Sequence, residues 1–129
     1  MKPRWLILVA SLGLAAIPAL AHHSFAAEFD GNKPIRIEGT LAKLEWTNPH
    51  AYFYIDVKDD KGNVVTWGCE GATPGQLTRQ GFRRGEVKLG DKIVVDGYAA
   101  KDGAHLMNAR RIYLNGKVIF APPDEGGGQ

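Results

Sequence analysis

The sequence has very little cysteine: Cys69 is the only one among 129 residues. A single thiol excludes an internal disulfide, so the fold has to depend on its hydrophobic core. Cys69 comes at the end of a strand-like run, where we expect it to be buried as a packing residue. The alternative is a soft metal ligand, a role in which thiolates are common.

The sequence also lacks a large excess of either basic or acidic residues. The chain has 16 basic and 14 acidic residues, and Lys2 and Arg4 lie in a segment that we expect to be removed. Proteins that bind nucleic acids usually carry a clustered basic face. The only local cluster, formed by Arg79, Arg83 and Arg84, is typical of a solvated helix end. The balance of charge therefore predicts no nucleic-acid partner.

Long apolar runs are absent after residue 21. Residues 5–17 form a nearly uninterrupted apolar stretch behind Lys2 and Arg4, followed by Ala19-Leu20-Ala21. A basic start, an apolar stretch too short to span a bilayer and a small-x-small end are typical of a cleavable export signal. We therefore expect residues 1–21 to be removed, the protein to be periplasmic or secreted, and no membrane anchor to remain.

The rest of the chain predicts an all-β domain. Alternation of apolar and polar residues predicts strands over 35–46, 50–58, 64–70, 92–100, 105–114 and 118–120. Thr73-Pro74 predicts the beginning of one short helix, because threonine is a common cap and proline suits the first helical position. Gly39 lies inside the first predicted strand, where a glycine suits a bend or a bulge.

This order of elements predicts a small OB-like Greek-key barrel of five or six strands, with one short helix between strands three and four. A β-sandwich would need about seven strands. We expect residues 22–34 to be a leader tethered by Phe25 and Phe29, residues 35–121 to form the barrel, and residues 122–129 to be a disordered tail.

Two histidines fall in the loops through which OB barrels usually bind ligands, those joining strands one to two and four to five. His50 lies in the first of these loops and His105 in the second. The predicted fold therefore leads us to expect ligand binding at these two loops.

Cleavage after Ala21 makes His22 the first residue of the mature protein. Its free amine and its imidazole offer copper two nitrogens, and the imidazole of His50 adds a third. Three nitrogens match the tetragonal preference of Cu(II), and His23 is a supporting donor. Copper is therefore the predicted cofactor at His22, His50 and His23. The alternatives are an unligated terminus, or cleavage at a later small residue that discards both leader histidines.

A second candidate copper site combines His50, His105, Met107 and Trp46. Imidazole, thioether and an indole face form a plausible environment for Cu(I), because thioethers are soft ligands. This set of residue types on an OB-like barrel resembles the small periplasmic copper chaperones, although the spacing does not reproduce their motif. The alternative is that Trp46 and Met107 are ordinary core residues.

Three motifs resemble a family of small exported bacterial proteins of unknown function: AHHSFAAEFD, EWTNPHAYFYIDVKD, and GYAAKDG followed by NARR. The WTNPH segment is the most specific. The resemblance implies an OB-like barrel behind a signal peptide and no settled activity. His22, His23 and His50 occupy matching positions, whereas His105 and Met107 lie beside the matched stretch.

The predicted function is copper sequestration or delivery in the periplasm. Catalysis is not expected, since no nucleophile has a positioned acid or base partner and the four tyrosines are expected to pack in the barrel instead of forming a stacking surface. The alternative function is a non-catalytic interaction module. It would bind a periplasmic protein partner or a small organic ligand through the same loops, with Trp46, Tyr52 and Trp67 as contacts. A copper redox activity is a third possibility.

Overall fold

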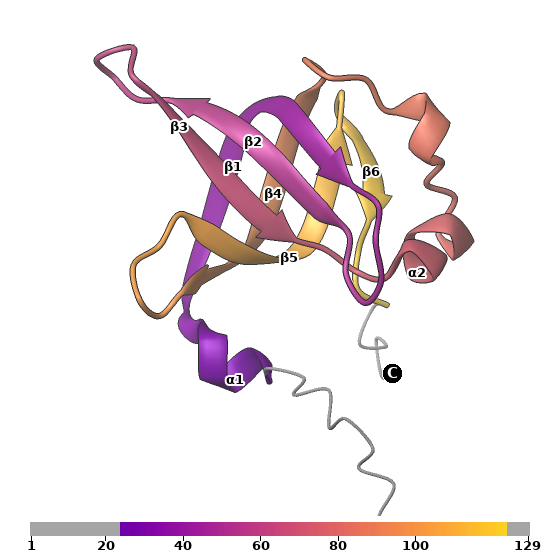
Figure 1. Cartoon of the computed structure of the whole chain (residues 1–129), viewed down its shortest axis with the longest axis horizontal. Coiled ribbons are helices and arrows are strands. Elements are labelled where there is room, and N and C mark those ends of the chain that lie inside the picture. The colour runs from indigo at the N-terminus through magenta and orange to yellow at the C-terminus, as the bar shows by residue number, and fades with distance from the viewer. Residues whose placement is uncertain (1–23, 124–129) are drawn as a thin grey trace, which may run out of the picture.

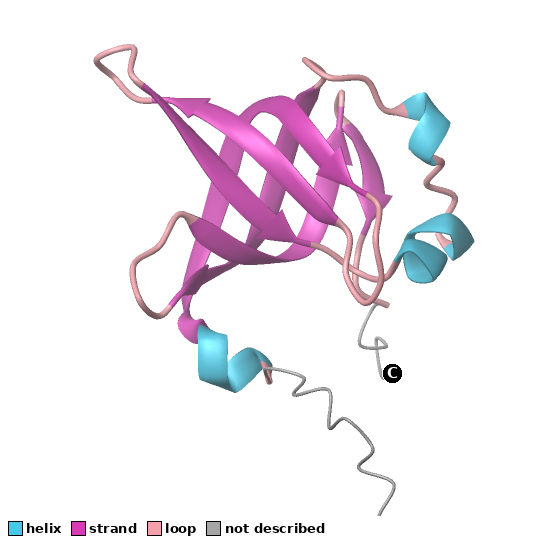
Figure 2. Ribbon diagram, in the orientation of Figure 1, coloured by secondary structure: helices cyan, strands magenta, loops and turns pink. Residues whose placement is uncertain are grey.

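Six strands and three short helices make up residues 24–123, the part of the chain that the computed structural model describes (Figures 1 and 2). In chain order they are α1 (Phe25–Glu28), β1 (Phe29–Glu45), β2 (Tyr52–Lys58), β3 (Val64–Glu70), α2 (Pro74–Arg79), the 3₁₀ helix η1 (Arg84–Glu86), β4 (Lys92–Ala100), β5 (Leu106–Leu114) and β6 (Lys117–Phe120). The predicted signal (1–21) and most of the predicted tail lie outside the described residues.

The strands form one sheet in the order β3-β2-β1-β4-β5-β6, and the pairs along it are antiparallel. The sheet closes because Gly68–Glu70 of β3 also pair, in parallel, with Leu106–Asn108 of β5. The α2 helix separates β3 from β4 in the sequence. The predicted all-β, OB-like barrel is therefore confirmed.

Strand β1 belongs to both halves of the barrel. Thr40 is the residue at which β1 passes from one neighbour to the other, since it pairs with Lys92 of β4 and with Asp56 of β2. A Cβ atom on Gly39 would lie 2.1 Å from the carbonyl oxygen of Asp56. The predicted bend at Gly39 is thus a close approach of two backbones, and the register shift follows slightly later, between Leu41 and Lys43.

β1 begins at Phe29, six residues earlier than the sequence predicts. Phe29 is 2% exposed and pairs with Ala100, and its ring stacks on Phe25 at a centroid distance of 5.8 Å. The two aromatics pack on each other, and β1 begins inside the segment 22–34 that the sequence led us to expect as a leader. The polar residues 30–33 show no alternation, and only pairing with β4, which is distant in sequence, makes this segment a strand.

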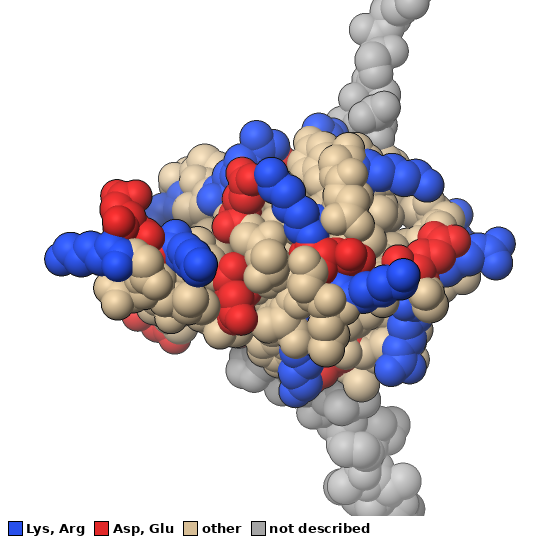
Figure 3. All heavy atoms as spheres, turned by 90° about the horizontal axis from the view of Figure 1, so that it is seen from above, with Lys and Arg blue, Asp and Glu red and all other residues tan. Residues whose placement is uncertain are grey.

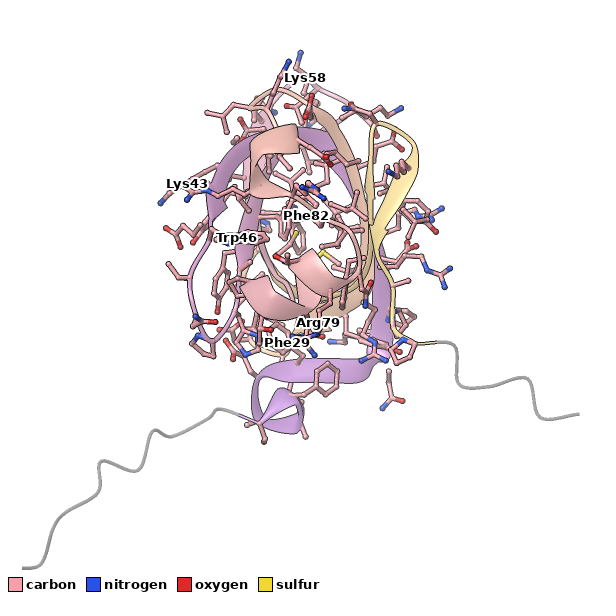
Figure 4. All side chains as sticks on the ribbon, turned by 90° about the vertical axis from the view of Figure 1, so that its right-hand side faces the viewer. Phe29, Lys43, Trp46, Lys58, Arg79 and Phe82 are labelled. Atoms are coloured by element: carbon pink, nitrogen blue, oxygen red, sulfur yellow. The ribbon has the colours of Figure 1, made fainter. Side chains whose placement is uncertain are left out.

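The apolar core fills the barrel, and α2 covers one end of it. Thr73 Oγ1 accepts a hydrogen bond from the backbone of Gln76, whose side chain accepts one from the backbone of Thr73, a capping box that fixes the start of α2. Leu77 of α2 is fully buried. Figure 4 looks onto this end, where the Phe82 ring lies 5.3 Å from that of Trp46. Among the described residues, no helix has the length and apolar character needed to cross a membrane.

The close approach at Gly39 makes a stability prediction. Gly39→Ala should lower the free energy of unfolding by about 2 kcal/mol or more, because the added methyl group meets backbone that cannot move aside. Gly85→Ala is the matched control, since nothing lies within 4 Å of the added atom, and its effect should stay within about 0.5 kcal/mol. Urea unfolding of both variants measures the difference. Equal stability of the two variants would show that β1 is not constrained at this point.

Candidate functional site

The loop between β1 and β2 holds His50 in a defined position. His50 Nδ1 lies 3.0 Å from the carbonyl oxygen of Gly71, and His50 Nε2 lies 3.6 Å from Glu70 Oε1. The loop is fastened to the end of β3 by two backbone hydrogen bonds, from Ala51 N to Ala72 O (3.0 Å) and from Gly71 N to Ala51 O (2.7 Å). The imidazole is therefore anchored at one nitrogen while 39% of its side chain stays exposed.

The contact with Gly71 determines the tautomer of His50. A carbonyl oxygen only accepts hydrogen bonds, so Nδ1 carries the hydrogen and donates it. In the neutral imidazole this leaves a lone pair on Nε2, the nitrogen next to the carboxylate of Glu70. Histidines that bind metals usually donate their other ring N–H to a carbonyl or carboxylate, which fixes the ring in this way.

Glu70 connects His50 to the outer face of the barrel. Its side chain is only 12% exposed, and Tyr52 donates its hydroxyl hydrogen to Glu70 Oε2 over 3.0 Å. Burial, followed by the hydrogen bond and negative charge of Glu70 and by the charge of Glu28, raises the pKa of Tyr52 well above its usual range. Tyr52 thus stays a neutral donor, and Glu70 keeps its other oxygen directed toward His50.

Tyr52 and Tyr54 form a stacked pair on this outer face, with ring centroids 6.4 Å apart and planes 24° apart. Tyr54 donates to Glu45 (3.1 Å), and the Lys43 ammonium lies 5.2 Å from the centroid of its ring. Burial and then Glu45 raise the pKa of Tyr54. The expectation that the tyrosines only pack in the barrel is wrong for this pair. The signal was present in the sequence, because both alternate with the buried Phe53 and Ile55.

The second predicted set of ligands does not come together. Met107 is fully buried, Trp46 packs against Phe82, and the His105 ring lies over Trp67 at a centroid distance of 5.0 Å. The backbone N–H of Gly68 in β3 donates a hydrogen bond to the carbonyl oxygen of His105. His50 instead contacts Gly71, three residues further along the chain. Across residues 24–123, no three His, Cys, Asp or Glu side chains are grouped closely enough to hold a metal. His22 and His23 lie outside the described residues.

Glu70 is the site residue that sequence reasoning missed. It is the last residue of β3, and no spacing motif connects it to His50, which lies 20 positions earlier. The two meet only because β3 returns alongside β2 as an antiparallel partner, pairing Glu70 with Tyr52. The strand pairing thus places a mostly buried carboxylate beside a half-exposed imidazole.

A family model covering residues 9–108 matches the chain, and it describes a family of unknown function, DUF6152. The chain belongs to this family. The match extends from the expected signal segment into β5 and confirms the resemblance to a family of unknown function that the motifs indicated. No curated protein matches the sequence significantly.

Two solved structures are similar to the DUF6152 chain in fold. Both are crystal structures of the mitochondrial single-stranded DNA-binding protein Rim1 from S. cerevisiae, one of them selenomethionine-labelled. The first is 15% identical, covers 64% of this chain and 93% of its own, and has a TM-score of 0.48. The second is 13% identical, covers 64% and 92%, and has a TM-score of 0.42. The likeness concerns the architecture alone.

These matches contradict the partner prediction that excluded nucleic acids. That exclusion rested on the balance of charge over the whole chain, whereas both similar structures are of a protein described as a single-stranded DNA-binding protein. Total charge is a poor criterion here because stacking of bases on aromatic side chains supplies part of the affinity for single strands. The expectation of no nucleic-acid partner is therefore withdrawn.

Cys69 is the buried packing residue that the sequence predicts. It is fully buried, and burial raises the pKa of its thiol to about 12. A thiol ionises in the unfolded chain near about pH 8.5. The folded state therefore holds the proton more tightly, and this thiol disfavours the folded state progressively as the pH rises from there toward 12.

We expect Cys69 to resist a thiol reagent such as dithionitrobenzoate at pH 8 in the native protein and to react completely in guanidinium chloride. Only the thiolate attacks the reagent, and the buried thiol is both protonated and shielded. Absorbance of the released thionitrobenzoate measures the reaction. Rapid labelling of the native protein at the rate of a free thiol would contradict the burial of Cys69.

Proposed function

We propose that this protein is an exported copper-binding protein that sequesters or delivers the ion at the loop between β1 and β2. One observation carries the proposal: the hydrogen bond from His50 Nδ1 to Gly71 O leaves Nε2 available beside the mostly buried carboxylate of Glu70. The ring is held in its ligating tautomer before any ion arrives, which reduces the cost of ordering it upon binding.

The donor chemistry favours copper. Imidazole nitrogen and carboxylate oxygen together suit a tetragonal Cu(II) site. His22 and His23, the predicted start of the exported chain, would supply the remaining nitrogens, including the free amine. The proposal includes no redox step, and the localisation follows from the predicted signal.

A second candidate function is the binding of a small organic ligand by the same face. The observation that favours it is the stacked pair of Tyr52 and Tyr54 next to Glu70. Aromatic rings beside a few fixed polar groups are typical of sites for small molecules. In this function His50 would orient the ligand instead of binding a metal.

The copper proposal is tested by titrating Cu(II) into the processed, exported protein, with intact mass used to establish its first residue. His50→Ala should weaken binding by more than tenfold, since removing a supporting group alone often costs about 10–100-fold. Glu70→Gln keeps the shape of the side chain but removes its charge, and it should weaken binding less. Affinity should fall in acid, because protons compete with the metal ion for imidazole.

His105→Gln is the matched control, because His105 packs on Trp67 away from this loop. It should leave the affinity unchanged. An extra residue placed ahead of His22 should weaken binding if the amine is a ligand, and electron paramagnetic resonance should show an axial, nitrogen-rich signal. Equal copper affinity in the His50 and His105 variants would contradict the proposal. Tyr52→Ala would then be the variant with which to test the organic ligand.

A further inference from the structure

The outer face of β1, β4 and β5 carries two adjoining depressions that the proposed copper site does not use. One has a volume of about 480 Å³ and is lined by residues that include Arg36, Tyr98 and Arg110. The other, of about 530 Å³, is lined by residues that include Arg36, Lys92 and Tyr113. Both volumes lie within the range of small-ligand sites. They meet at Arg36, so together they form one surface, here called the Arg36 groove.

Arg36 lines both depressions, and its contacts hold its side chain in place. Its guanidinium makes a two-pronged contact with Asp96 (2.7 and 2.9 Å) and lies 5.7 Å from the centroid of the Tyr113 ring. Lys92 pairs with Glu38 over 2.8 Å in the second depression. The groove therefore contains two ion pairs whose carboxylates and cations are held in place before a ligand arrives.

A bulge in β5 directs Arg110 into the first depression. Asp96 pairs with Arg111 and Gly97 pairs with Ala109, which leaves Arg110 as the extra residue. A Cβ atom on Gly97 would lie 2.0 Å from Asn108 O, so glycine is required opposite the bulge. Bulges commonly re-aim a side chain beside a functional site. Arg110 is exposed, and no carboxylate of the described residues forms an ion pair with it.

A tyrosine lies in each depression. Tyr98 lines the first, where Phe25 of α1 packs edge-on against its ring at 5.5 Å, and Tyr113 lines the second. The groove thus combines the ring of Tyr98, the cation of Arg110, the Arg36–Asp96 ion pair and the ring of Tyr113. Figure 3 shows one face of the molecule, on which basic and acidic side chains are interspersed. Within the groove, the ion pairs likewise place Arg36 next to Asp96 and Lys92 next to Glu38.

We propose that the Arg36 groove binds an acidic glycan. A sugar ring packs its apolar face on Tyr98 while its carboxylate takes two hydrogen bonds from Arg110, the planar geometry that arginine recognises best. Hydroxyl groups of the next ring donate to Asp96 and Glu38 and accept from Arg36. The following ring lies against Tyr113.

The carboxylates favour a sparsely charged polymer. A single-stranded nucleic acid would bring a phosphate with every ring, and some of these would lie against Asp96 and Glu38. In a glycan with a carboxylate on alternate sugars, the ring on Tyr98 brings its carboxylate to Arg110, the cation without an ion-pair partner, and the next ring, which lies against the ion pairs, is neutral. The hydroxyl groups of the glycan donate hydrogen bonds to the carboxylates of the two ion pairs and accept them from the cations.

The test is a calorimetric and NMR titration of the processed protein with a hyaluronan tetrasaccharide, in which glucuronate alternates with N-acetylglucosamine. The N-acetylglucosamine tetramer is the neutral probe and should bind at least about tenfold more weakly, since it lacks the carboxylate that takes charge-assisted hydrogen bonds from Arg110. Arg110→Gln should cause a similar loss for the acidic tetrasaccharide, and Tyr98→Leu should weaken both probes. Arg84→Gln, a change of an exposed arginine on η1, is the control and should have no effect.

Amide shifts should concentrate on β4 and β5 around Tyr98 and Arg110, and circular dichroism establishes that each variant is folded. Three results would overturn the proposal: no binding of the acidic tetrasaccharide, equal binding by the Arg110 and Arg84 variants, or shifts confined to the His50 loop. Binding of a single-stranded oligothymidylate in this groove, without binding of the tetrasaccharide, would assign the groove to nucleic acid instead. Because the groove shares no residue with the His50 site, a failure here leaves the copper proposal intact, and the reverse also holds.

Discussion

The parallel pairing of β3 with β5 is the interaction on which the closed barrel depends. It involves only Gly68–Glu70 and Leu106–Asn108, yet it turns an open sheet into a closed one. The middle pair, Cys69 and Met107, is fully buried in the core. At one end of the pairing Gly68 binds the His105 carbonyl, and just beyond the other end Gly71 binds His50. Closure therefore places His105 against β3, and the antiparallel pairing of β2 with β3 brings His50 to the other end of the same strand.

The same alternation that builds the core also builds the outer face. Successive residues of β2 point to opposite sides, so the burial of Phe53 and Ile55 forces Tyr52 and Tyr54 outward. Across from them, Gly68 carries no side chain, and an added Cβ there would lie 3.2 Å from Leu106 Cδ1. A larger residue at Gly68 would press on the strand pairing itself. Function on this face is thus constrained by the packing that closes the barrel.

Local patterns in the sequence predicted the elements that local interactions form. The ranges 64–70 and 92–100 agree with β3 and β4, and the Thr73–Pro74 signal agrees with the start of α2. The start of β1 was missed because polar residues there become strand only by pairing with β4. Glu70 was missed for the same kind of reason, since its contact with His50 arises from strand pairing and not from spacing along the chain. The bulge that exposes Arg110 likewise needs both strands to exist.

The net charge of the whole chain, only +2, does not show that two of its faces differ in their electrostatics. Around Tyr52, the nearby charges are the carboxylates of Glu70 and Glu28, which favour a cation. In the Arg36 groove, three cations stand against two carboxylates: Arg36, Lys92 and Arg110 against Glu38 and Asp96. Exposed charges more than about 10 Å apart hardly influence each other at physiological salt. Each face therefore presents its own local field, and a chain of low net charge is compatible both with the proposed cation site on one face and with the proposed acidic-glycan site on another.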